Sequence, residues 1–168
     1  RSTLKLLPRV KKALGKRGIQ PDIFVSRSHE HIPQISARID IHGYDAIVAM
    51  GGDGTNFQMI NGLLSEHPPE TLPPLGILPA GSGNSFAKDL KIKNIDDGIR
   101  AIQRNHPRPV DMISFSSGTN RFYFVNLMGF GFVTDVAVTA QDFKYFHDFS
   151  YLIGIFHRTA SLCFHHME

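Results

Sequence analysis

Apolar positions in the first hundred residues alternate between short continuous runs and a helical spacing. The continuous runs have strand length and cover residues 22–26, 45–50 and 75–79, as expected of strands buried on both faces of a parallel sheet. Apolar residues three and four positions apart predict helices between and around these strands. The predicted helices cover residues 4–17, 28–40, 55–64, 84–90 and 95–103. This alternation favours an α/β fold in which helices cover a parallel sheet.

The pattern changes after residue 107, where strand-like runs follow one another without helices between them. These runs cover residues 110–115, 121–132 and 133–138, with turn signals at 116–120 and a helical spacing again at 151–163. The sequence HPRP at 106–109 interrupts the last helix of the first part. We therefore expect an α/β domain over residues 1–108 and the incomplete start of a β-rich domain over residues 109–168.

Composition adds little beyond these patterns. The chain has 168 residues, 42% of them hydrophobic, and a net charge of +3, which suits one domain or parts of two and is too weakly basic to indicate a nucleic-acid partner. Its single cysteine, Cys163, excludes an intrachain disulfide and fits a cytoplasmic location. No apolar run is long enough to span a bilayer. The basic side of helix 4–17 is expected to face solvent, with contact to a membrane surface as the alternative.

Two glycine-rich turns are the main functional signal. GGDGT (51–55) follows the predicted strand 45–50, AGSGN (80–84) follows the strand 75–79, and a predicted helix follows each turn. A helix N-terminus presents unpaired backbone N–H groups, and glycines let a phosphate approach them closely. A single turn of this kind is also compatible with a tight connection. Two of them, both at the carboxyl edge of one parallel sheet, favour a phosphate-binding crevice.

Asp53 lies inside the first of these turns, where a bare carboxylate would repel phosphates. A bound metal ion or a transferred proton would remove that conflict. Neither turn matches the pattern GxxxxGK[ST] of P-loop proteins or the GxGxxG pattern of dinucleotide-binding folds. The turns therefore indicate a different class of nucleotide-binding protein.

The order of these motifs resembles the catalytic domain of diacylglycerol kinases, sphingosine kinases and bacterial lipid kinases. The resemblance rests on GGDGT (51–55) with NGL (61–63) behind it and on LPAGSGNSFA (78–87), and it extends to GFGFVTDV (129–136) and SYLIGIF (150–156). NAD kinases share the GGDGT motif. The resemblance implies an α/β domain that binds ATP and Mg²⁺, followed by a β-sandwich domain that helps to bind the lipid. We accordingly expect the chain to be part of a longer kinase, with one strand before it and most of the β-sandwich after it.

The resemblance also implies roles for individual residues. Asp53 would be the general base or an acid linked to the metal. The residues that bind the metal are not assigned. Lys144 would contact a phosphate, and Asp135 would contact the headgroup of the acceptor lipid. The residues expected to line the nucleotide are Gly51, Gly52, Gly54, Thr55, Gly81, Ser82, Gly83 and Asn84.

Two positions depart from the bacterial pattern, in which the residues after GGDGT include an Asn and then a Glu. This chain has Phe57 at the position of that Asn and Gln58 at the position of that Glu. Phe57 removes a polar contact to the nucleotide, and Gln58 removes a negative charge that could support Mg²⁺. The leading hypothesis is an ATP-dependent lipid kinase whose substrate lies at a membrane surface, with peripheral membrane contact. The alternatives are a soluble NAD kinase-like enzyme and a relative that binds nucleotide or lipid without turnover. The sequence does not decide between a monomer and a homodimer.

Overall fold

A computed structural model of the chain describes residues 2–126. The chain divides into two compact units, residues 1–126 and 127–168, and all described residues belong to the first. The expectations for Asp135, Lys144 and the strands and helix beyond residue 126 lie outside the described residues. The domain boundary near residue 108 stays a prediction.

A two-stranded parallel sheet lies at the centre of the first unit. Strand β1 (Ile47–Gly51) pairs with β2 (Leu75–Pro79), with Ile47 opposite Leu75 and Gly51 opposite Pro79. Parallel neighbours need a long crossover connection, and helix α3 (Asp53–Glu66) provides most of it. This register brings the carboxyl ends of both strands to the same edge.

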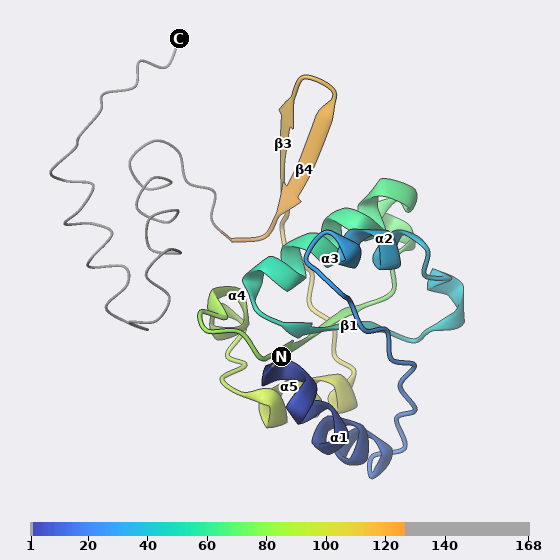
Figure 1. Ribbon diagram of the computed structural model, residues 1–168, viewed down its shortest axis with the longest axis vertical. Helices are drawn as coiled ribbons and strands as arrows, with labels where there is room; N and C mark the ends of the chain where they lie inside the picture. Colours follow the sequence, from blue (N-terminus) through green and yellow to red (C-terminus); the bar gives the residue numbers. More distant parts are fainter. Residues whose placement is uncertain (1, 127–168) are drawn as a thin grey trace, which may run out of the picture. The chain divides into compact units, whose positions relative to one another are not determined.

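Helices cover both faces of this sheet (Figure 1). Helix α2 (His31–Ala37) packs beside α3 on one face, and α1 (Ser2–Gly15) and α5 (Ile95–Arg104) lie on the other. Each interface has its own apolar cluster. The α3 cluster comprises Ile41, Ile47, Ala49, Met59 and Leu63. The cluster of α1 and α5 comprises Val10, Leu14, Leu78 and Ile99. The remaining helical elements are the turns η1 (Ile41–Gly43) and η2 (Pro69–Thr71) and the short helix α4 (Ser85–Asp89).

Helix α5 begins with reciprocal capping between side chains and backbone. The Asn94 side chain accepts a hydrogen bond from the Asp97 N–H at 2.9 Å, and the Asp97 carboxylate accepts one from the Lys93 N–H at 3.0 Å. The Lys93 hydrogen bond lowers the pKa of Asp97, and the charge of Arg100 lowers it further. Because the folded-state pKa is lowered, this stabilisation is present above the ordinary aspartate pKa and is lost as pH falls through the lowered value.

An antiparallel hairpin follows the α/β part. Strand β3 (Ile113–Ser117) pairs with β4 (Asn120–Phe124), with Phe115 opposite Phe122. The turn between them uses Gly118 at φ 59°, a left-handed conformation that glycine adopts without strain. The predicted turn at 116–120 and the change to β structure are therefore confirmed, whereas the β-sandwich stays a prediction.

The α/β class and its helices are confirmed, but the strand predicted at 22–26 is wrong. Residues 22–26 form neither strand nor helix, and Phe24 in their middle is 57% exposed. A strand exists only where a neighbour supplies ladder hydrogen bonds. Within residues 2–126, β1 and β2 are the only strands of the parallel sheet, so this apolar segment has no neighbour there. None of the helices within residues 2–126 has the length and apolar character that crossing a membrane requires.

The contact between α2 and α3 gives a direct test of the fold. Gly62 is buried in α3, and an added Cβ would lie 2.5 Å from the backbone of Pro33. Gly62→Ala should therefore lower the free energy of unfolding by about 1–3 kcal/mol, as overpacked sites do. Gly15→Ala is the matched control because nothing lies within 4 Å of its added Cβ, and it should raise stability by up to about 1 kcal/mol. Equal chemical-denaturation midpoints for the two variants would contradict this packing.

Candidate functional site

The two glycine turns lie side by side at the carboxyl edge of the sheet. Gly51 ends β1 opposite Pro79, and the Ala80 N–H donates to the Gly51 carbonyl oxygen at 2.9 Å. An added Cβ on Gly81 would lie 2.5 Å from the Gly52 Cα, and one on Gly52 would lie 3.1 Å from the Gly81 Cα. The backbones of the two turns are therefore in direct contact, which a side chain at Gly81 would prevent and one at Gly52 would crowd.

Side chains within each turn fix its shape. Thr55 covers Gly51, since a Cβ there would lie 2.2 Å from the Thr55 hydroxyl oxygen. Asn84 adopts a left-handed conformation (φ 54°). Its side chain accepts from the Gly81 N–H at 3.0 Å and donates to the Gly81 carbonyl oxygen at 2.6 Å. Asn84, expected to line a nucleotide, therefore holds the second turn closed.

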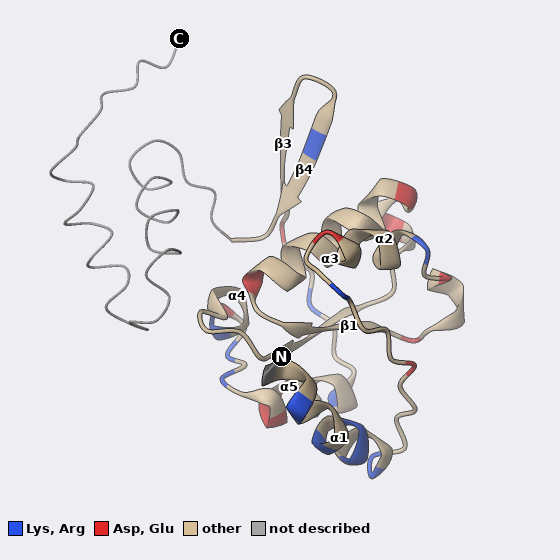
Figure 2. Ribbon diagram, viewed as in Figure 1, with Lys and Arg blue, Asp and Glu red and all other residues tan. Residues whose placement is uncertain are grey.

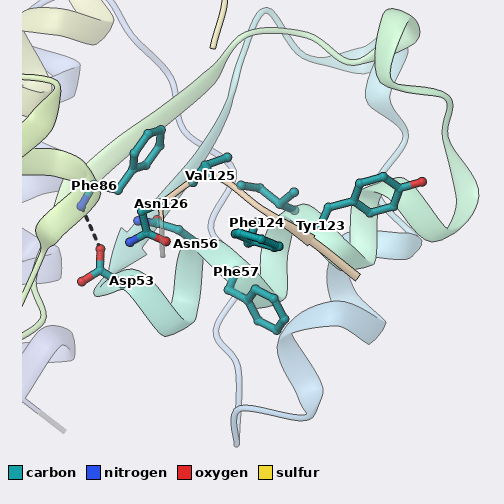
Figure 3. A pocket seen from close by; sticks show the side chains of 9 residues that line it. Asp53, Asn56, Phe57, Phe86, Tyr123, Phe124, Val125 and Asn126 are labelled. Atoms are coloured by element: carbon teal, nitrogen blue, oxygen red, sulfur yellow. Dashed lines mark hydrogen bonds between the residues drawn. The ribbon is translucent and has the colours of Figure 1, made fainter. Parts of the chain in front are cut away.

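The Asp53 carboxylate connects the two turns. Its Oδ2 accepts a hydrogen bond from the Ser85 N–H at 2.9 Å, and its Oδ1 accepts one from the Phe86 N–H at 3.0 Å (Figure 3). Both donors are first-turn N–H groups of α4 that lack an intrahelical partner. Asp53 thus caps α4 from the start of α3. In this structure the partner of the carboxylate is the backbone of the second turn, an arrangement that the sequence analysis did not foresee.

Several backbone N–H groups of the turns remain without a hydrogen-bond partner within residues 2–126. They belong to Asp53 and Gly54 at the start of α3 and to Ser82 and Gly83 in the second turn. The second pair lies in an exposed segment. Unpaired N–H groups at a helix N-terminus and in a glycine turn are the donors that bind phosphate oxygens.

A small cavity adjoins Asp53 on the side of the hairpin. Its volume is about 10 Å³, close to what one water molecule needs. Figure 3 shows the side chains that line it. They come from α3, α4, the end of β4 and the two residues that follow it: Asp53, Asn56, Phe57, Ile60, Phe86, Tyr123, Phe124, Val125 and Asn126.

Asn56 is a polar residue in this lining that the sequence analysis missed. It is 4% exposed, and its Oδ1 has no hydrogen-bond partner in the described part of the chain. A buried acceptor without a partner is costly and indicates a bound donor, such as water or a ligand group. The sequence signal was an asparagine directly after GGDGT, but only the structure shows that α3 turns this side chain inward.

The described residues fit a metal ion that is held mainly by a nucleotide. They contain no group of three or more His, Cys, Asp or Glu side chains arranged to hold a metal. Asp53 is the one carboxylate within the turns 51–55 and 80–84. Mg²⁺ commonly binds through one or two carboxylates together with substrate phosphates and water, so Asp53 could supply the protein ligand.

A family model for the diacylglycerol kinase catalytic domain matches residues 1–115. The chain belongs to this family. The match covers both glycine turns, the helices that follow them and the start of β3. The resemblance inferred from GGDGT, NGL and LPAGSGNSFA is therefore confirmed.

Relatives of this diacylglycerol kinase catalytic-domain chain include sphingosine kinases and a diacylglycerol kinase. Sphingosine kinase 1 of Arabidopsis thaliana is 30% identical over 81% of the chain and 30% of its own length. Sphingosine kinase 1 of Mus musculus is 27% identical over 92% of the chain and 44% of its own length. A diacylglycerol kinase of Staphylococcus saprophyticus is 33% identical over 79% of the chain and 42% of its own length. The chain thus spans less than half the length of these curated relatives.

The contact between the turns predicts unequal effects of two alanine substitutions. Gly81→Ala should distort the second turn because the new Cβ meets the Gly52 backbone, and it should weaken binding of an ATP analogue about tenfold or more. The control is Gly43→Ala, outside both turns, whose added Cβ meets only the Asp40 carboxylate at 3.5 Å, so affinity should stay within about threefold, since ordinary contacts need no rearrangement. Isothermal titration of both folded variants measures the difference. Equal affinities would show that the contact between the turns does not shape a nucleotide site.

Proposed function

We propose that this chain is the nucleotide-binding part of an ATP-dependent lipid kinase. The observation that carries the proposal is the pair of glycine turns, which present unpaired N–H groups on both sides of the Asp53 carboxylate. Phosphoryl transfer depends mainly on positioning the phosphates and neutralising their charge. The N–H groups of Ser82 and Gly83 would bind phosphate oxygens, and Asp53 would help to hold Mg²⁺, which would neutralise further charge.

The proposed acceptor is a lipid hydroxyl. Relatives named sphingosine kinase and diacylglycerol kinase favour a long-chain base, diacylglycerol or a similar amphiphile over NAD. Asp135 is proposed to contact the headgroup and Lys144 a phosphate, and both lie outside the described residues. A homodimer stays a prediction. The non-catalytic alternative rests on Phe57 and Gln58, which replace two polar residues of the bacterial pattern.

Asp53 caps α4 in the structure, and two further roles are proposed for it. It would accept the proton of the attacking hydroxyl or support Mg²⁺. Each carboxylate oxygen that accepts one backbone hydrogen bond keeps a second acceptor direction. The cap therefore leaves Asp53 able to bind Mg²⁺ or a hydroxyl proton as well.

The experiment that tests the function is phosphoryl transfer by the full-length protein from radiolabelled ATP to a panel of lipids in mixed micelles, with NAD as a parallel acceptor. We expect transfer to a lipid. Asp53→Asn should reduce it by ~10²–10⁴-fold, the usual loss for a positioned base. The NH₂ group of the introduced asparagine would also face one of the two N–H donors of α4 and could not accept its hydrogen bond. Hydrogen exchange at Ser85 or Phe86 should therefore become faster.

The Asp53→Asn variant also distinguishes the role as base from the role in binding the metal. Unchanged affinity for Mg²⁺–ATP would indicate the base, whereas weaker affinity that excess Mg²⁺ partly restores would indicate the metal. Near-normal turnover would refute both. Transfer to NAD alone would favour the NAD kinase-like alternative, and nucleotide binding without any transfer would favour the non-catalytic one.

We also propose that the kinase contacts the membrane peripherally, and α1 offers a suitable surface. Figure 2 shows Lys and Arg concentrated on this helix, which contains no acidic residue. Lys5, Lys12 and Lys16 are exposed. Lys5 and Lys12 lie on one face of α1, and Lys16, directly after the last residue of the helix, continues their spacing, away from the buried Val10 and Leu14. Within residues 2–126 none of the three lysines forms an ion pair, although Arg9 on the same helix pairs with Asp96 at 2.6 Å.

A charge-removal variant tests this surface. Because each lysine near an anionic membrane contributes on the order of a fivefold gain in binding, Lys12→Ala with Lys16→Ala should weaken binding to phosphatidylserine vesicles by about 25-fold. Arg38→Ala with Arg108→Ala removes the same charge at exposed positions elsewhere and serves as the control. Vesicle co-sedimentation at constant ionic strength measures both. Equal losses in the two double variants would show that net charge, not α1, determines membrane contact.

A further inference from the structure

The side chain of Asn61 makes three hydrogen bonds on the surface of α3. Its Nδ2 donates to the carbonyl oxygens of Phe57 and Tyr123, both at 2.8 Å, and its Oδ1 accepts from the Tyr123 N–H at 2.8 Å. The two carbonyl oxygens and the N–H determine which way the amide faces, since only NH₂ can donate to both carbonyls. We call the pair of hydrogen bonds between Asn61 and the Tyr123 backbone the Asn61 clamp.

The clamp does for β4 what a neighbouring strand would do. Tyr123 lies opposite Ser114 in the hairpin, and its N–H and carbonyl both bond to the Asn61 side chain instead of to β3. In antiparallel sheets, a hydrogen-bonded residue exchanges both bonds with one partner residue. Asn61 imitates that exchange, so it fixes which residue of β4 meets α3 and thereby the register of the strand along the helix.

Residues 123–126 extend from the clamp toward Asp53. Asp53, Phe57 and Asn61 follow one another at intervals of four residues and therefore share one face of α3. At ~1.5 Å per residue, the helix covers about 12 Å from Asn61 to Asp53. From Tyr123 to Asn126 the chain covers at most about 10 Å, at ~3.3 Å per extended residue, because residues 125 and 126 form bends after β4. Accordingly, Asn126 and Asp53 line the same small cavity (Figure 3).

We infer that Asn61 is a positioning residue of the phosphoryl-transfer site, an inference that rests on the lipid kinase function proposed above. The clamp sets the register that places residues 123–126 as one wall of the small cavity beside Asp53, a cavity that Phe86 of α4 also lines. It contacts neither glycine turn. Losing the clamp should therefore disturb the reacting groups around Asp53 while leaving the phosphate-binding N–H groups in place.

The chemistry of the clamp makes asparagine difficult to replace. An ionised aspartate at this position would keep the acceptor for the Tyr123 N–H but place a negative oxygen against the carbonyl oxygens of Phe57 and Tyr123. A protonated aspartate would instead donate one hydrogen bond and restore part of the pattern. These contacts with carbonyl oxygens favour the neutral acid, which raises the pKa of the introduced carboxyl.

The test compares Asn61→Ala and Asn61→Asp with the wild-type full-length kinase. Both variants should lose about tenfold or more in kcat, as small misplacements near the reacting atoms do, with the affinity for an ATP analogue changed less than about twofold. The activity of Asn61→Asp relative to wild type should rise as pH is lowered from about 8 to about 5, because protonation restores a donor. Asn105→Asp makes the same change at an exposed helix end and should show neither effect.

Hydrogen exchange gives a readout independent of activity. The Tyr123 amide should exchange faster in Asn61→Ala, whereas the amides of the turns 51–54 and 81–84 should not change. If Asn61→Asp does not fold, Asn61→Ala carries the test alone.

Several results would overturn the inference: unchanged kcat in folded variants, ATP affinity reduced as strongly as kcat, or a ratio of Asn61→Asp to wild-type activity that does not vary with pH. If the wild-type protein phosphorylates no lipid, the proposed function fails and the positioning role fails with it. Faster exchange at Tyr123 would then still show that the clamp exists.

Discussion

The hydrogen bonds between the Asp53 carboxylate and the N–H groups of Ser85 and Phe86 hold the candidate site together. They join the start of α3 to the start of α4 through residues that lie 32 and 33 positions apart along the chain, and so fix the distance between the two turns. A capping side chain normally comes from the residue just before the helix. Here that residue is Asn84, whose amide is occupied with Gly81, and a carboxylate from the neighbouring turn takes over the cap.

This arrangement explains why a carboxylate lies between glycines. The glycines let the two backbones touch, and the carboxylate then satisfies the donors that the contact brings close. Positive dipole ends of helices also favour a negative group at this point. A nucleotide would meet a surface where some N–H groups are already taken by Asp53 and others, at Ser82 and Gly83, are open. The same residue that builds the site would therefore act on the phosphates or on the proton of the acceptor.

Much of the α/β part could be predicted from the sequence, because its signals are local. Apolar runs and helical spacings located β1, β2 and the helices around them, and glycines after each strand located the turns. Residues 22–26 show the limit of such signals, since an apolar run becomes a strand only beside a hydrogen-bonding neighbour. The contacts that shape the site are not local: Asp53 with α4, and Asn61 with Tyr123, 62 residues further on. The spacing of these residues in the sequence does not predict their partners. The sequence also did not predict that Asn56 is buried.

The central claim is that the open N–H groups of the two turns bind nucleotide phosphates, and amide hydrogen exchange at single-residue resolution tests it most directly. On addition of Mg²⁺–ATP to the full-length protein, the amides of Ser82 and Gly83 should become protected, together with those of Asp53 and Gly54. The amides of Ser85 and Phe86, already bonded to Asp53, should change little. Protection elsewhere in the protein with no change at these four amides would contradict the account.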